Sequence, residues 1–140
     1  MSTIESLIRL HRWQVDERRR SLAELEGLAE QLRDELRRLA EEQQAEADAA
    51  SGSLEAQFAY AGYVRQAMER QRTLEKSQAD VEVQMLQARE ALAQAFEEMK
   101  RYETAATNRE RLRVQRVARR ESLELDALAI ENFRRRSGTS

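Results

Sequence analysis

Apolar residues recur in the first third of the chain at alternating steps of four and three. This stripe has twelve positions, nine of them apolar: Ile4, Ile8, His11, Val15, Arg18, Leu22, Leu25, Ala29, Leu32, Leu36, Leu39 and Gln43. An average spacing of 3.5 residues is typical of the seam of a left-handed coiled coil. Charged residues fill the flanks of the stripe, as in Asp34-Glu35 and Arg37-Arg38. The pattern predicts one long helix over about residues 3–49.

A turn-like cluster, Ala50-Ser51-Gly52-Ser53, interrupts this pattern, and Ser53 is placed to cap a new helix. A second stripe with the same spacing runs through Tyr60, Val64, Ala67, Gln71, Leu74, Gln78, Val81, Met85, Ala88, Leu92, Ala95, Met99, Tyr102 and Ala106. We expect a tip over about residues 50–66 that contains a short helix. A second long helix should then run over about residues 67–136, followed by a disordered tail at 137–140.

Two long helices joined by a short break predict an all-α fold. We expect an elongated antiparallel two-helix coiled-coil hairpin with a short helical tip, forming a single domain over residues 1–140. Matching large against small side chains across the seam pairs residues whose numbers sum to about 114. This register places His11 near Tyr102 and Gln43 near Gln71. In this register the pairing ends near Ile4 of the first helix. About 27 residues of the second helix, or ~40 Å, are then left without a partner helix.

Composition further limits the class of protein and the partners that we expect. The chain has no proline, four glycines, 5% aromatic residues and 36% charged residues, so it cannot fill a globular core but can bury a narrow stripe. The net charge of −2 favours neither nucleic acid nor a membrane as partner, and the absence of cysteine excludes disulfides and thiolate sites. The longest uncharged stretch, residues 56–64, is too short to span a bilayer. We therefore expect a cytoplasmic protein that does not insert directly into a membrane.

Candidate chemistry is sparse. Catalytic carboxylates need a pocket that excludes water, and a two-helix hairpin offers none for the 26 acidic residues. The single histidine, His11, lies on the seam without a metal-ligand spacing around it, and we interpret it as a register-setting or partner-contacting residue. The four glycines are scattered rather than gathered in a phosphate-binding loop. We predict no enzyme activity, no metal and no cofactor.

The second stripe fails at a basic segment, Arg109–Arg120, which has six arginines and one glutamate. Three interpretations remain open for it: a solvated helix face, docking onto an acidic protein surface, or nucleic-acid binding. The last lacks the aromatic platforms that nucleic-acid binding usually needs. We expect no nucleic acid as partner.

Three apolar clusters have no partner within the expected hairpin. One is Trp13 with Leu7 and Leu10. The other two are the C-terminal set Leu123, Leu125, Leu128, Ile130 and Phe133 and the tip aromatics Phe58, Tyr60 and Tyr63. Exposed apolar clusters mark partner sites or unrecognised packing. For the tip, both interpretations stay open.

The sequence resembles the flagellar export protein family FliJ. The resemblance rests on the charged opening Ser6–Arg20, the leucine heptads through Leu39, the hairpin length and the aromatic tip. At the tip, Tyr60, Tyr63 and Ala67 stand where the family has tyrosine, phenylalanine and leucine at the same spacing, so two of the three positions depart from its pattern.

The resemblance implies a non-enzymatic component of the flagellar type III protein export apparatus. Such a protein would be the coiled-coil stalk that engages the hexameric export ATPase and the cytoplasmic domain of the export gate, and that handles export chaperones. It would be cytoplasmic, peripherally associated with the inner membrane through the apparatus, and a monomer when free. The alternatives are the equivalent stalk protein of a virulence injectisome and a self-assembling structural coiled coil.

The same resemblance suggests contact residues. Contact with the export gate would fall to Tyr60, Tyr63, Val64 and Ala67. Contact with the ATPase would fall to Leu7, Leu10, Trp13, Arg113, Arg116, Arg120, Leu123, Leu125, Leu128 and Phe133.

Overall fold

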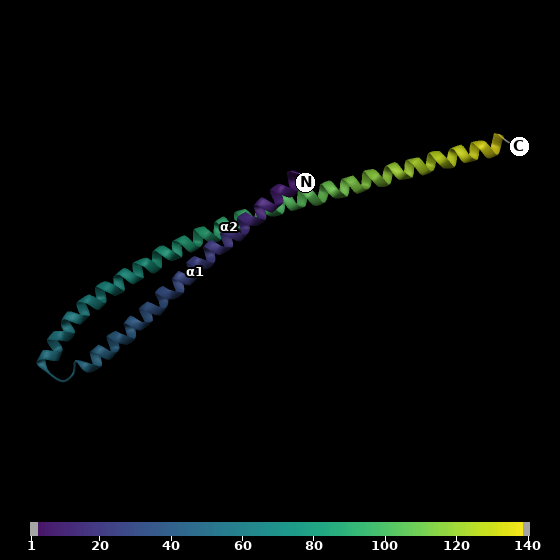
Figure 1. The fold of residues 1–140 in the computed structure, drawn as a ribbon. Coiled ribbons are helices and arrows are strands. Elements are labelled where there is room, and N and C mark those ends of the chain that lie inside the picture. Colours follow the sequence, from purple (N-terminus) through teal and green to yellow (C-terminus); the bar gives the residue numbers. More distant parts are fainter. Residues whose placement is uncertain (1–2, 139–140) are drawn as a thin grey trace. The chain divides into compact units, whose positions relative to one another are not determined.

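The computed structural model describes residues 3–138, which form two long α-helices and the turn between them (Figure 1). Helix α1 spans Thr3–Ala49 and helix α2 spans Leu54–Gly138, and no strand occurs within the described range. The two helices pack against each other as an antiparallel hairpin, which confirms the predicted all-α fold. The internal contacts divide the chain into two units: Trp13–Phe96, and the residues up to Arg12 together with those from Glu97 onward.

The turn between the helices is held by local hydrogen bonds. The backbone N–H of Ala50 donates to the carbonyl of Glu46 at 3.1 Å, which closes the last turn of α1. The Ser53 hydroxyl accepts the N–H of Ala56 at 3.1 Å, and this is the N-cap predicted from the sequence. Because Ser53 satisfies a donor that the first turn leaves without an intrahelical partner, α2 can begin directly after it.

The helix boundaries differ from the sequence-based expectation at both ends of α2. Residues 54–66 are the first turns of α2 itself rather than a separate tip helix, because they include no proline and only one glycine, Gly62. One glycine costs a helix only about 1 kcal/mol relative to alanine, which a long helix absorbs. Ser137 and Gly138 are helical rather than part of a tail, while residues 139–140 of the expected tail lie outside the described range.

The unit Trp13–Phe96 contains most of the length over which α1 packs against α2. Its core is one cluster of buried side chains from both helices: Ala29, Leu32, Leu39, Ala67, Leu74, Val81 and Met85. Between residues 60 and 95, every position of the second stripe is buried or half-buried, as the periodicity predicts. The Gln43 amide lies 3.5 Å from the Gln71 amide, which confirms the predicted register at this layer.

In the other unit, α2 continues well beyond the residues that α1 covers. The seam positions Met99, Tyr102 and Ala106 are still buried or half-buried, whereas every residue from 107 to 138 is exposed. We call residues 107–138 the overhang. Within the described residues, no helix is long and apolar enough to cross a membrane.

Candidate protein-interaction sites

Where α1 begins, a polar layer occupies the seam. The His11 ring is only 9% exposed and stacks on the ring of Tyr102, with centroids 4.5 Å apart and an interplanar angle of 19°. Its Nδ1 atom is buried without a hydrogen bond and lies 3.7 Å from Oε2 of Glu98. The stack places His11 opposite Tyr102, as the predicted register requires.

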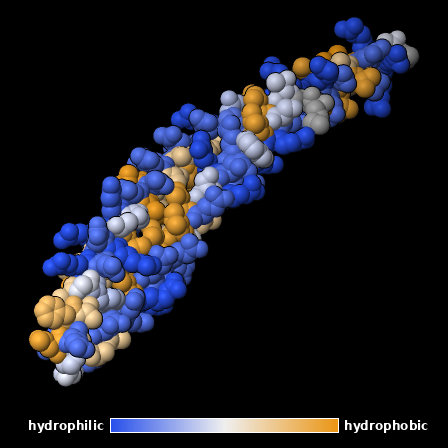
Figure 2. All heavy atoms as spheres, turned by 60° about the vertical axis from the view of Figure 1, so that its left-hand side comes forward, coloured by the Kyte–Doolittle hydropathy of each residue, from blue (hydrophilic) through white to orange (hydrophobic). Residues whose placement is uncertain are grey.

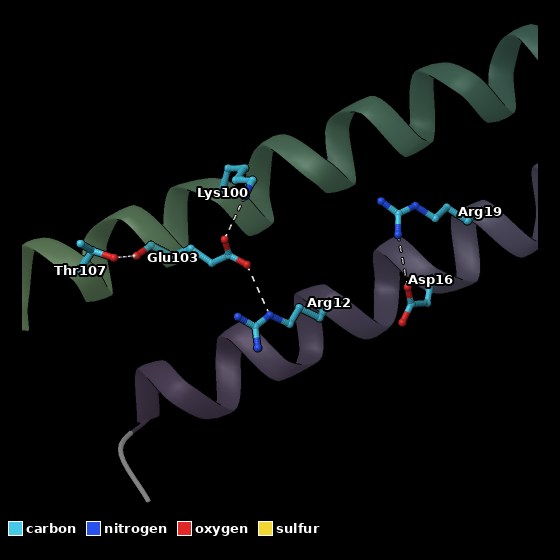
Figure 3. Close-up of polar contacts among 6 residues, drawn as sticks. All are labelled: Arg12, Asp16, Arg19, Lys100, Glu103 and Thr107. Atoms are coloured by element: carbon cyan, nitrogen blue, oxygen red, sulfur yellow. Dashed lines mark hydrogen bonds and ion pairs between the residues drawn. The ribbon is translucent and has the colours of Figure 1, made fainter.

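Next to this layer, one carboxylate joins the two helices. Glu103 accepts a hydrogen bond from Arg12 Nε and another from Lys100 Nζ, each at 3.3 Å (Figure 3). The bond from Lys100, together with that from Arg12, holds the pKa of Glu103 below its ordinary value of 4.5 despite some desolvation. The Arg12–Glu103 pair links α1 to α2 near the start of the overhang. We call these three residues the open-end clamp.

The residues expected to contact the ATPase belong to both units of the chain. Leu7 and Leu10 lie on α1 in the same unit as the overhang, whereas Trp13 lies in the other unit and is 59% exposed. All the overhang candidates are exposed: Arg113, Arg116, Arg120, Leu123, Leu125, Leu128 and Phe133. A residue must be exposed to bind a partner, and these seven overhang residues are.

The arginines of the overhang are not equivalent. Arg113 Nη2 lies 2.7 Å from Oε1 of Glu110 one turn earlier, and this pairing raises the pKa of Arg113 and lowers that of Glu110. Arg116 and Arg120 instead line a shallow surface depression with Leu123. A partner could therefore reach Arg116 and Arg120 without first displacing an intrahelical carboxylate.

Around the turn, the residues expected to contact the gate face the seam. Ala67 is 4% exposed and belongs to the core cluster, and Tyr63 packs against that cluster. Burial of the Tyr63 hydroxyl, with Glu42 and Glu46 nearby, raises the pKa of Tyr63. Tyr60 and Val64 are half-buried. Of the two interpretations left open for the tip aromatics, inward packing describes Tyr63.

Other apolar residues near the turn point to solvent. Phe58 is 74% exposed, and Leu54 and Met68 are also exposed. Residues 54, 58 and 68 lie within about 80° of one another around a helix, so they share one side of α2. Figure 2 shows hydrophobic side chains gathered on the surface at this end of the unit. The sequence analysis named Phe58 but not Leu54 and Met68. Both are apolar residues that do not belong to the second stripe, and this position alone predicts that they are exposed.

The fold defines a class of protein, an all-α helical hairpin with exposed apolar side chains. The family model of the flagellar FliJ protein matches residues 1–138, and the chain belongs to this family. It is therefore a component of flagellar type III export, which favours the flagellar system over the injectisome alternative. No curated protein and no solved structure matches the chain.

Proposed function

We propose that the chain is the non-enzymatic coiled-coil stalk of the flagellar export apparatus and that its overhang engages the hexameric export ATPase. One observation carries this proposal: every residue of the overhang is exposed, although eight large apolar side chains lie on it. They are Leu112, Val114, Val117, Leu123, Leu125, Leu128, Ile130 and Phe133. Exposed apolar side chains gathered on one segment in this way mark a protein-interaction site.

The energetics favour a partner on this segment. Burying an exposed leucine or phenylalanine side chain fully stabilises a complex by roughly 1.5–3 kcal/mol, so a few of these residues suffice for specific binding. An isolated helix also gains little from propensity alone and is stabilised mainly by packing of its apolar face. The basic residues 109–120 would steer the segment toward an acidic surface.

For the end of the unit Trp13–Phe96 that holds the turn between the helices, we propose contact with the cytoplasmic domain of the export gate. The seam-facing positions of Tyr63 and Ala67 leave little of these two side chains for a partner. The half-buried Tyr60 and Val64 supply the accessible part of such a surface on the seam side, and the exposed Phe58 lies on another side of the same turns of α2. Tyr63 and Ala67 would then support the contact from beneath.

Handling of export chaperones, residence in the cytoplasm and peripheral association with the inner membrane complete the proposal. They rest on membership of the FliJ family and on the exposed apolar surfaces that such contacts need.

The truncation of the chain after Ala106 tests the proposed function. It removes the overhang and leaves every buried seam residue in place. We expect the truncated chain to fold and to lose stimulation of the export ATPase, because the docking surface is gone. Full stimulation by the truncated chain would contradict the proposal.

A further inference from the structure

The overhang has a segmented charge pattern. Residues 109–120 have six arginines and one glutamate, a net charge of +5, and we call them the basic block. Residues 121–131 have four acidic residues and no basic one, a net charge of −4, and we call them the acidic block. Three arginines follow at 134–136. The two blocks are almost equal in length and nearly opposite in charge.

Most of these charges have no partner along their own helix. Within the described residues, Arg116, Arg119 and Arg120 form no ion pair. The same holds for the carboxylates of the acidic block nearest to them, Glu121, Glu124 and Asp126. Favourable pairing along one helix needs opposite charges three or four residues apart, and segregation into blocks limits it to a few places, such as Glu110–Arg113 and Glu131–Arg135.

Apolar side chains lie within both blocks. Leu112, Val114 and Val117 belong to the basic block, and Leu123, Leu125, Leu128 and Ile130 to the acidic block, all of them exposed. A shallow surface depression lies where the blocks meet, lined by Arg116, Arg119, Arg120, Leu123, Glu124 and Ala127. A helix that covered this segment would bury apolar surface along its whole length.

We propose that the overhang binds the overhang of a second copy of this chain, side by side and antiparallel. In that orientation the basic block of each copy lies along the acidic block of the other, so opposite charges compensate each other. The side of the helix that holds Leu112, Leu123 and Ile130, which lie within about 20° of one another around the helix, is then covered. A parallel pairing would set like blocks together, and like charges within a Debye length of about 10 Å repel. The two-fold axis passes near Arg120 and Glu121, where the blocks meet.

The paired segment is about 23 residues long, or ~35 Å, and an interface of this length is at the small end of specific interfaces. The chain is therefore monomeric when dilute and pairs as its concentration rises. This pairing does not depend on the export function. It would hide the surface proposed for the ATPase, so the two contacts exclude each other.

Analytical ultracentrifugation of the full chain over a range of micromolar concentrations tests the pairing. We expect reversible dimerisation that weakens about tenfold or more between low salt and ~0.5 M NaCl, because salt screens exposed charge pairs. Truncation after Ala106 should abolish it. A monomer at every concentration, or a dimer that the truncated chain retains, would overturn the proposal.

Two charge variants test the role of the blocks. The first changes Glu121, Glu124, Asp126 and Glu131 to Lys, and the second changes Arg109, Arg113, Arg116 and Arg120 to Glu. Each variant alone should stay monomeric, whereas an equimolar mixture should form heterodimers. The mixture also serves as the folding control, since a misfolded variant would not pair. Homodimers of either variant, or an unpaired mixture of two helical variants, would overturn the proposal.

Spin labels test the orientation, and the natural absence of cysteine makes single labelling simple. In an antiparallel dimer, labels on Ser122→Cys should lie close together, and labels on Asn108→Cys should lie roughly 40 Å apart along the axis. Short distances at both positions would establish a parallel pairing and contradict the proposal.

Discussion

The ring of His11 stacks on the ring of Tyr102, with their centroids 4.5 Å apart, in the polar layer where α1 begins. The stack fixes the register of the helices at this layer, although His11 Nδ1 has no hydrogen bond. A buried polar group without a hydrogen bond costs roughly 1–3 kcal/mol, so the layer favours one register at the expense of stability.

Replacement of this imidazole should therefore stabilise the fold. We expect His11→Leu to raise the free energy of unfolding by about 1 kcal/mol, because it removes the unsatisfied nitrogen and keeps the apolar volume. Urea denaturation monitored by circular dichroism measures the change. Tyr102→Ala is the comparison, since it deletes the stacked ring and should destabilise. Any loss of stability in His11→Leu would contradict this account.

Two leucines one turn apart on α1 test the assignment of the buried core. Leu32 is 8% exposed and belongs to the core cluster, whereas Leu28 is 42% exposed. We expect Leu32→Ala to lower the free energy of unfolding by about 2–3 kcal/mol, the low end for buried leucines, because the two-helix seam is thin. Leu28→Ala should cost less than about 1 kcal/mol. Equal costs at the two positions would show that the seam is misassigned.

The open-end clamp makes stability depend on pH. The folded pKa of Glu103 lies below its ordinary value of 4.5, so the folded state favours the ionised carboxylate. Its contribution is complete above pH 4.5 and is lost as the pH falls through the lowered folded value. Glu103→Gln should therefore be less stable than the natural chain at neutral pH, and the difference should shrink in acid. Thermal unfolding between neutral and acidic pH measures this, with the exposed Glu124→Gln as control.

Substitutions near the turn separate packing from docking. Tyr63→Ala should lower the melting temperature, because Tyr63 packs against the core cluster. Phe58→Ala should leave the melting temperature unchanged, because Phe58 is exposed. If Phe58 anchors the gate contact with ~2 kcal/mol, its removal weakens binding to the gate's cytoplasmic domain roughly thirtyfold. Unchanged gate binding by Phe58→Ala would remove this residue from the proposed surface.

Much of the hairpin could be predicted from periodicity, since burial follows the stripes closely. Of the twelve positions of the first stripe, only Arg18 is exposed, because its long side chain can leave the seam and keep its charge in water. The Arg12–Glu103 bridge was not foreseen, because stripes fix which faces meet but not which flanking side chains pair. The extent of α2 also escaped prediction, because a separate tip was assigned to residues 50–66, whereas the single Gly62 in this range does not end the helix.

The residues expected to contact the gate were assigned two roles that conflict. Tyr60, Val64 and Ala67 are positions of the second stripe, and the same residues were expected to meet an external partner. A helical side chain at a seam position points toward the partner helix, so one residue rarely serves both roles. The structure resolves this conflict for Ala67, which is buried in the seam. The exposed Phe58, on another side of α2, is the additional candidate that we propose.

The most direct test of the central claim is site-specific photo-crosslinking to the hexameric export ATPase. A photoreactive residue at Leu125 in the overhang is compared with one at Val83, since these side chains are 66% and 56% exposed on the same helix. We expect crosslinks to the ATPase from position 125 and none above background from position 83. Crosslinking from position 83 that equals or exceeds that from position 125 would contradict the proposal that the overhang engages the ATPase.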